Sequence, residues 1–276
     1  MSDARGTAAG ASHAGGRRRR WPRSIAWHRT ALILVLLALW EGAARFRWLD
    51  PDFFSPPTKV VAAMVDLATP PVLAAARVTA MEVGWAFALA AGVGVSLGLV
   101  IGLSAFAYRT FRPIVLLLFS VPKMVMLPLF ILFFGIGVLS KAVFAFSLGV
   151  FPILLNVIAG TRMVDPTLIT AAYCMGASRV GIFAKVVLPA ALPSVITGLR
   201  VGMTQTVLGV LLAELYAANT GLGYYVALYS QTFKPAQLFA LFFVVAALSI
   251  LANEALRALE RRAGRWREED VELRAV

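Results

Sequence analysis

Six long apolar blocks occupy most of this chain and limit what it can fold into. A helix needs about 20 residues to cross the hydrocarbon core of a bilayer, and each block reaches or approaches that length. The polar connections are short, so no soluble domain fits between the blocks. Hydrophobic residues make up 60% of the 276 positions, against roughly 45–50% in soluble domains. The chain is predicted to be an all-α membrane protein with six transmembrane helices, at about residues 30–46, 79–106, 113–136, 142–159, 194–218 and 235–256.

The basic residues gather on one side of these six blocks. The net charge is +12, and most Lys and Arg lie in the two tails, around Arg109 and in the connection 160–193. The opposite side keeps mainly Lys59, Arg77, Lys141 and Lys234. Because Lys and Arg stay in the cytoplasm during insertion, both termini are predicted to be cytoplasmic, an N-in/C-in topology. This distribution accounts for the positive charge without a nucleic-acid partner.

Composition divides the chain into three parts. Residues 1–29 are rich in Gly, Ala, Ser and Arg and are predicted to be a disordered basic cytoplasmic tail. Residues 30–258 form the six-helix transmembrane domain, and residues 259–276 a second cytoplasmic tail. The run Arg17–Arg20 could be taken for an export signal, but no small-x-small cleavage site follows the first block. An uncleaved anchor is therefore favoured.

The residue inventory argues against chemistry inside the membrane. The only cysteine is Cys174, and both histidines precede the first block, so we expect no disulfide within the chain and no Cys- or His-based metal site. No Gly-x-x-x-x-Gly-Lys-Ser/Thr run is present, so the chain has no nucleotide site of that kind. A membrane-embedded enzyme remains an alternative hypothesis, but it would need clustered acids, and these are scattered. A passive channel is the other alternative.

Several local signals refine the blocks. Gly94, Gly98 and Gly102 are four residues apart, so they share one helix face that lets another helix approach closely. The segment 108–113 is predicted to be a basic turn. Pro122 should break the third block, and Lys123 beside it should snorkel or face a polar cavity. A short surface helix is expected at 59–67, with Thr58 as its cap.

The connection 160–193 is the most ordered polar segment. Asp165 followed by Pro166 is a good helix start. Gly176 can end that helix in a left-handed cap, and Ser178 can begin a second helix that runs to Pro189. Two short helices with a glycine hinge, partly apolar and exposed to the cytoplasm, need a protein partner. The alternative is an amphipathic connector that rests on lipid headgroups.

The residue order in this connection resembles the EAA loop of ABC-importer permeases. That pattern has Glu-Ala-Ala, three residues, Gly, nine residues and Ile-x-Leu-Pro. Here the order is Thr170-Ala171-Ala172, three residues, Gly176, nine residues and Val-Val-Leu-Pro, ending at Pro189. Thr170 stands in the place of Glu, which is expected to alter ion pairing without loss of coupling. The resemblance implies an ATPase-coupling loop, with these site residues: Asp165, Thr170, Ala171, Ala172, Gly176, Ala177, Ser178, Arg179, Leu188 and Pro189.

The chain as a whole resembles the nitrate/sulfonate/taurine-type branch of these permeases. The segments that carry the likeness are 54–57, 121–128, 133–137, 151–156, 164–166 and 221–223. The resemblance implies a type I ABC importer permease in the bacterial cytoplasmic (inner) membrane. Two copies, favoured as a homodimer, would form a path for a small anionic solute. Two ATPase subunits would hold ATP and Mg, a solute-binding protein would lie outside, and this chain itself would carry no cofactor. The solute stays open.

Four polar residues inside apolar blocks are candidates for the translocation path: Asn156, Thr204, Gln205 and Glu214. Two of them have an alternative role. Glu214 could pair with the nearby turn 219–223, and Asn156 could bond across helices instead of touching solute.

Overall fold

The computed structural model describes residues 23–48, 50 and 53–263, and every regular element in these ranges is a helix. The all-α prediction is therefore confirmed. Most of the two predicted tails, residues 1–22 and 264–276, lies outside the described residues. The predicted first tail is too long, because residues 23–29 already belong to the first helix.

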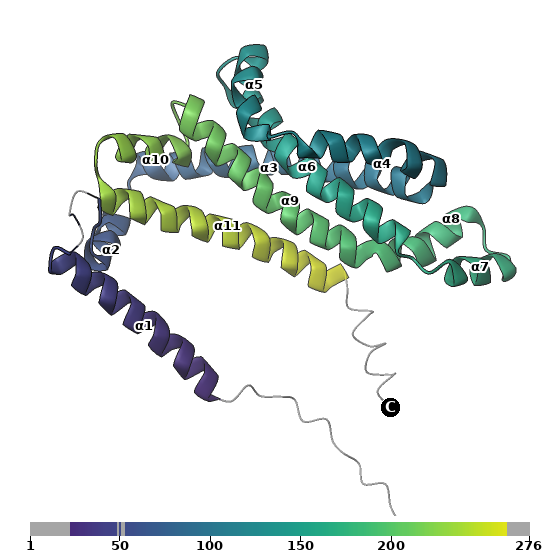
Figure 1. Ribbon diagram of the computed structural model, residues 1–276, viewed down its shortest axis with the longest axis horizontal. Coiled ribbons are helices and arrows are strands. Elements are labelled where there is room, and N and C mark those ends of the chain that lie inside the picture. The colour runs from purple at the N-terminus through teal and green to yellow at the C-terminus, as the bar shows by residue number, and fades with distance from the viewer. Residues whose placement is uncertain (1–22, 49, 51–52, 264–276) are drawn as a thin grey trace, which may run out of the picture.

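The helices follow one another with few loop residues between them (Figure 1). A 3₁₀ turn (η1) and a π turn (η2) join some of them. The bounds are α1 Arg23–Arg45, α2 Pro57–Asp66, α3 Pro70–Leu103, α4 Ala105–Ser120, η1 Lys123–Met126, α5 Leu127–Phe134, α6 Val138–Arg162, α7 Pro166–Cys174, α8 Arg179–Ile182, η2 Phe183–Val187, α9 Leu188–Ala217, α10 Leu222–Gln231 and α11 Pro235–Ala263.

Four helical runs of the described chain are long and apolar enough to cross a membrane. They are α3, α6, the run from Arg179 to Ala217, and α11. Helix α4 and the segment Lys123–Phe134 make a fifth span if this bent pair is counted as one, with an angle of 75° at the break. These spans make the chain a multi-pass membrane protein, since a helix satisfies its own backbone hydrogen bonds in lipid.

Helix α6 is the centre of the bundle and packs most extensively on α9 and α3. Glycines make the approach close on the α3 side. A Cβ atom added at Gly94 would lie 2.8 Å from Ile153 Cγ2, and one at Gly98 would lie 2.6 Å from Val157 Cβ. The predicted packing face on α3 is confirmed. In lipid the hydrophobic effect does not drive helices together, so close van der Waals packing of this kind holds them in contact.

Helix α9 approaches the other side of α6 by the same device. A Cβ atom added at Gly198 would lie 2.8 Å from Asn156 Cβ, and one at Gly209 would lie 2.8 Å from Ala145 Cα. This second face was not predicted from the sequence. Its signal is the pair Gly198 and Gly202, which have the same four-residue spacing as the α3 glycines.

The predicted basic turn at 108–113 is wrong. These residues lie inside α4, because Ser104 ends α3 and starts α4: its hydroxyl accepts a hydrogen bond from the Ala107 N–H at 3.2 Å. Within α4, the Tyr108 ring lies under two guanidinium groups, 5.4 Å from Arg112 and 4.8 Å from Arg162. Cation–π contacts of this kind stabilise positive charge beside an apolar surface.

The predicted break at Pro122 is confirmed, and Lys123 closes it. The Lys123 ammonium donates to the Phe119 carbonyl at 2.9 Å and lies 4.5 Å from the centre of the Phe151 ring. The last carbonyl groups of a helix have no N–H donor within the helix. A positively charged group beside them is favourable, because it also interacts with the helix dipole. Lys123 therefore caps α4, where the sequence predicted snorkelling or a polar cavity.

Thr58 does not cap α2, contrary to the prediction. Pro56 is the residue before the helix and Pro57 is its first residue, so Thr58 lies within the first turn. Its N–H and hydroxyl both donate to the Glu41 carboxylate, at 3.1 and 2.9 Å. These bonds tie α2 to the last part of α1, whose first turns stand apart from the bundle in Figure 1.

Candidate functional site

Helix α7 opens the loop between α6 and α9, and its start matches the prediction. The Asp165 carboxylate accepts a hydrogen bond from the Thr167 N–H at 2.8 Å, and Pro166 occupies the first helical position. The Thr167 hydroxyl donates to the same oxygen. These two bonds, the hydroxyl bond first, hold the pKa of Asp165 below its usual value, because hydrogen bonds to a carboxylate favour its charged form.

We expect Asp165→Ala to loosen α7 and Asp165→Asn to leave it intact, because Asn is an equally good helix cap. In the wild type, the capping contribution is present above the unfolded pKa of Asp165 and is lost as pH falls through the lower folded pKa. Hydrogen exchange of the α7 amides checks this. Protection factors, which are corrected for the intrinsic exchange rate at each pH, should fall in acid for the wild type and show no such step for Asp165→Asn. Equal protection in all three chains would contradict the cap.

Gly176 ends the helical segment that contains α7, as the sequence predicts. Its φ angle is +78°, in the left-handed region that favours glycine. The Ala177 N–H donates to the Ala172 carbonyl at 3.0 Å, and the Gly176 N–H donates to the Tyr173 carbonyl at 2.9 Å. This pattern satisfies carbonyls that the helix end leaves open. Apart from the two neighbours of Gly176 in the chain, no described residue has an atom within 4 Å of an added Gly176 Cβ, so the hinge is open to a partner.

The second helix begins at Ser178, whose hydroxyl accepts from the Gly181 N–H at 3.2 Å. The prediction that it ends at Pro189 is wrong. Helix α8 continues through η2 into α9, and the run extends from Arg179 to Ala217. In the π turn, the Leu188 N–H donates to the Phe183 carbonyl. A π turn shifts the hydrogen-bond register by one residue, so the proline, which lacks an N–H, fits without ending the helix.

The two arms of the loop pack on each other through a small apolar core of Val164, Ala172, Ile182 and Val187. Ala172 therefore faces inward, whereas the sequence placed it on the partner side. The outer surface carries the large apolar side chains of Tyr173, Met175 and Val180, the last two 81% and 76% exposed. Apolar patches of this kind on an ordered element mark interaction sites.

The other predicted loop residues are distributed over this surface and its base. Thr170, Ala171, Ser178 and Arg179 are exposed, and Ala177 is half-buried. The Thr170 hydroxyl donates to the Pro166 carbonyl of its own helix at 3.0 Å. Leu188 and Pro189 are half-buried at the start of α9, so they lie where the loop joins the helix and not on its outer surface.

The four candidates for the translocation path do not meet at one point. Asn156 does not bond across helices: its amide donates to the Pro152 carbonyl of its own helix at 2.8 Å. Thr204 is exposed, and its hydroxyl donates to the Arg200 carbonyl at 3.2 Å. Gln205 is half-buried on α9. Glu214 is fully buried and accepts a hydrogen bond from Gly223 at 2.9 Å, which matches its alternative role of pairing with the turn.

The structure reveals a polar cluster that the sequence did not predict. Glu82 of α3 and Lys141 of α6 form an ion pair with side chains only 3% and 6% exposed. The Thr79 hydroxyl of α3 and the Glu214 carboxyl group of α9 share a hydrogen bond of 2.7 Å. Thr79 and Glu82 lie in one apolar block, Lys141 just before another and Glu214 in a third, so only their positions near block ends hinted at a meeting. Together they join three helices at the end of the bundle away from α7.

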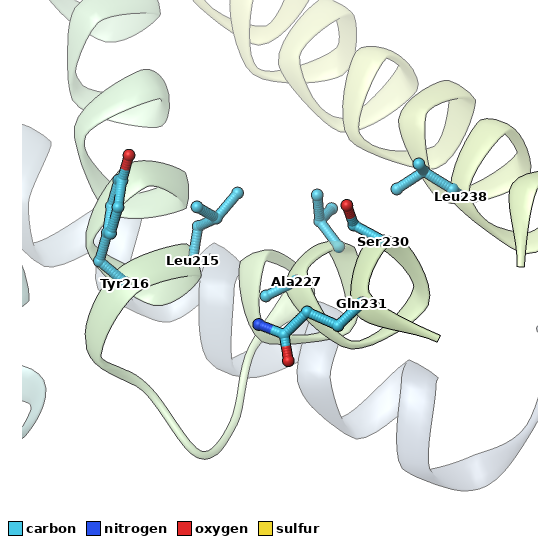
Figure 2. Close-up of a pocket in the computed structure, with 7 residues that line it drawn as sticks. Leu215, Tyr216, Ala227, Ser230, Gln231 and Leu238 are labelled. Atoms are coloured by element: carbon cyan, nitrogen blue, oxygen red, sulfur yellow. The ribbon is translucent and has the colours of Figure 1, made fainter. Parts of the chain in front are cut away.

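An open pocket lies at the same end, where α9, α10 and α11 meet. Its volume is about 420 Å³. Figure 2 shows Leu215 and Tyr216 from α9, Ser230 and Gln231 from α10, and Leu238 from α11 around it. Every lining residue is uncharged. The pocket and the loop of α7 and α8 therefore lie at opposite ends of one continuous helix.

A bundle of apolar helices with an ordered helical loop at one end defines a multi-pass membrane protein. Residues 90–265 match the family described as binding-protein-dependent transport system inner membrane component. The chain belongs to this family.

Relatives that match nearly the whole chain agree. The taurine transport system permease protein of Escherichia coli strain K12 is 33% identical over 257 residues, which is 91% of this chain and 94% of that one. The formylaminopyrimidine transport permease protein of Halalkalibacterium halodurans is 28% identical over 87% of this chain and 95% of that one. The putative aliphatic sulfonates transport permease protein of Bacillus subtilis strain 168 is 28% identical over 84% and 85%.

A solved structure shows the same fold. A chain of the inward-facing MetNI methionine ABC transporter superposes with a TM-score of 0.54 at 23% identity, covering 65% of this chain and 92% of that chain. The resemblance to sulfonate/taurine-type permeases is thus confirmed. The protein is a membrane-spanning permease subunit of an ABC importer, and the ATP hydrolysis that drives it takes place on a separate ATPase.

Proposed function

We propose that this permease imports a small anionic solute of the sulfonate or taurine class, and that the loop between α6 and α9 is its ATPase-coupling surface. The observation that carries the coupling role is the ordered loop with the open Gly176 hinge and an exposed apolar face. The substrate class is supported by the taurine and sulfonate relatives that match most of the chain.

Coupling would run along one helix. The segment from Arg179 to Ala217 is continuous, so a movement of α7 and α8 with the closing ATPase can tilt α9 as a rigid body. Rigid-body tilting of packed helices is a common way to alternate access. The far end of this helix carries Glu214 and borders the open pocket, where a solute-binding protein would dock from the other side of the membrane.

The topology belongs to the same proposal. Helix α1 supplies the sixth span, because its apolar side chains from Leu32 to Leu39 are largely exposed and tryptophans flank the segment at positions 27 and 48. Exposed apolar side chains with interfacial tryptophans suit lipid. With α1 as a span, both termini lie on the side of the coupling loop, in the cytoplasm of a bacterial inner membrane.

The assembly would hold two copies of this chain, two ATPase subunits and one solute-binding protein. ATP and Mg would bind to the ATPase subunits, and this chain would bind neither. The solute path would lie between the two copies, with Thr204 and Gln205 of α9 as its candidate polar residues. The homodimer and the subunit stoichiometry of this proposal are supported by the resemblance to binding-protein-dependent importers.

The test is purification of the tagged chain in mild detergent with its native neighbours, followed by reconstitution in proteoliposomes. We expect a stoichiometric ATPase to co-elute. Its ATP hydrolysis should rise with the cognate binding protein loaded with taurine or an alkanesulfonate, and nitrate and a formylaminopyrimidine serve as competing candidates. Elution as a lone membrane protein would overturn the coupling role. Stimulation by formylaminopyrimidine alone would overturn the substrate class and leave the coupling role intact.

A further inference from the structure

Four polar side chains are buried together where α3, α6 and α9 meet, away from the coupling loop. Thr79, Glu82, Lys141 and Glu214 are 0%, 2%, 5% and 0% exposed. If all three titratable groups were ionised, two carboxylates and one ammonium would leave one uncompensated negative charge. Burying such a charge costs several kcal/mol even after relaxation, and a buried group usually becomes neutral instead.

The surroundings distinguish the two carboxylates. Glu82 is held by Lys141 in a direct ion pair. Glu214 instead has neutral hydrogen-bond partners: the Thr79 hydroxyl at 2.7 Å and the Gly223 N–H at 2.9 Å. The charged groups that act on Glu214 are Glu82 from α3 and Lys141 from α6, and these two already neutralise each other. A proton on the cluster therefore belongs on Glu214.

The hydrogen bonds of Thr79 leave a place for this proton. Its hydroxyl oxygen lies 2.7 Å from Glu214 Oε1 and 3.2 Å from the Ala75 carbonyl, and it accepts the Leu222 N–H at 2.9 Å. A hydroxyl has one hydrogen and two acceptor lone pairs, so it can donate to only one of two acceptors. If Glu214 Oε1 carries a proton and donates it to Thr79, Thr79 can donate to Ala75, and every contact has one donor.

We infer that Glu214 and Thr79 hold one buried proton, and that this neutral acid locks the turn before α10 onto α3 and α9. At the junction of the turn with α10, the Leu222 N–H binds Thr79 and the Gly223 N–H binds Glu214. Gly221 has a φ angle of +109°, and a Cβ atom added at Gly223 would lie 2.6 Å from Glu214 Cβ. The turn is therefore seated on the Glu214 side chain. Loss of the proton places an unpaired charge there and releases the turn.

The matched test compares Glu214→Gln with Glu214→Ala in lipid nanodiscs. The glutamine amide can donate to Thr79 and accept from Gly223, so it reproduces the protonated acid. Alanine leaves the buried Gly223 N–H without an acceptor and removes the donor to Thr79, and the folded-to-unfolded ratio should fall by roughly tenfold or more. For the wild type, thermal stability should decline from mildly acidic to alkaline pH, because the folded state holds a proton that the unfolded state releases. Glu214→Gln should lack this decline.

Infrared spectroscopy locates the proton. The carbonyl stretch of a buried protonated carboxyl group should be present in the wild type, absent in Glu214→Gln and retained in Glu82→Gln. A band that persists in Glu214→Gln and vanishes in Glu82→Gln would place the proton on the wrong residue and overturn the inference. So would a wild type without the band whose stability is independent of pH. These readouts need no transport, so they stand apart from the proposed substrate and coupling loop.

Discussion

Gly176→Asp should weaken binding of the ATPase to this permease by about a hundredfold or more, and ATP-driven transport should fall with it. The φ angle of +78° excludes most side chains at this position, but Asp and Asn are the residues that tolerate the left-handed region best. Since no atom lies within 4 Å of an added Cβ, Asp fits inside the protomer. Its charge would then lie unpaired in the interface, which costs about 2–5 kcal/mol or more.

Gly176→Asn is the matched control, because it has the same shape and backbone tolerance without the charge. We expect it to keep the hinge and to reduce ATPase binding by about tenfold or less. Affinity of the detergent-solubilised chain for the purified ATPase measures both variants, and hydrogen exchange of α7 verifies that the hinge is intact. Equal losses in the two variants would assign the effect to backbone strain. Unchanged binding in both would show that the ATPase does not use this surface.

Gly98→Leu should prevent α3 from packing on α6 and destabilise the bundle by about 3 kcal/mol or more, the upper range of overpacking. An added Cβ would lie 2.6 Å from Val157 Cβ and 3.2 Å from the Leu154 carbonyl oxygen. A side chain can rotate away, but the backbone carbonyl can move only with its helix. Closely packed interiors resist such shifts.

Gly92→Leu provides the control on the same helix, because no atom lies within 4 Å of an added Cβ there. Folded yield in mild detergent and unfolding by sodium dodecyl sulfate measure both variants. Gly98→Ala combined with Val157→Ala should recover more stability than the two single changes predict, as contacting residues do in double-mutant cycles. Similar behaviour of Gly92→Leu and Gly98→Leu would contradict the close approach of α3 to α6.

Local signals in the sequence were sufficient for the helical architecture and for the shape of the loop between α6 and α9. A lipid-exposed segment must satisfy its backbone hydrogen bonds within itself, so apolar length alone predicted the helices. The caps of the loop depend on contacts a few residues apart: Asp165 with Thr167, Gly176 with Tyr173, and Ser178 with Gly181. The Gly94–Gly102 face is equally local, because it needs only the helical repeat.

The predictions that were wrong concern segments whose residues favour two different local structures. Pro189 looked like a helix end, but the π turn before it absorbs the missing N–H and α9 continues. The basic residues after Tyr108 looked like a turn, but Ser104 caps the helix earlier. Ala172 looked like part of the partner surface, but the fold of the two arms buries it. Each outcome depends on which of two allowed local structures the neighbouring helices favour.

The sequence by itself determined that this chain is a helical membrane protein and where the loop between α6 and α9 begins and turns, because partition into lipid and helix capping act over one segment at a time. Only the tertiary structure decided which polar residues meet: Glu82 with Lys141, and Thr79 with Glu214 and the turn at Leu222. These partners come from different spans. Their pairing depends on the order, rotation and depth of whole helices, and those are set by packing around α6 rather than by any single segment.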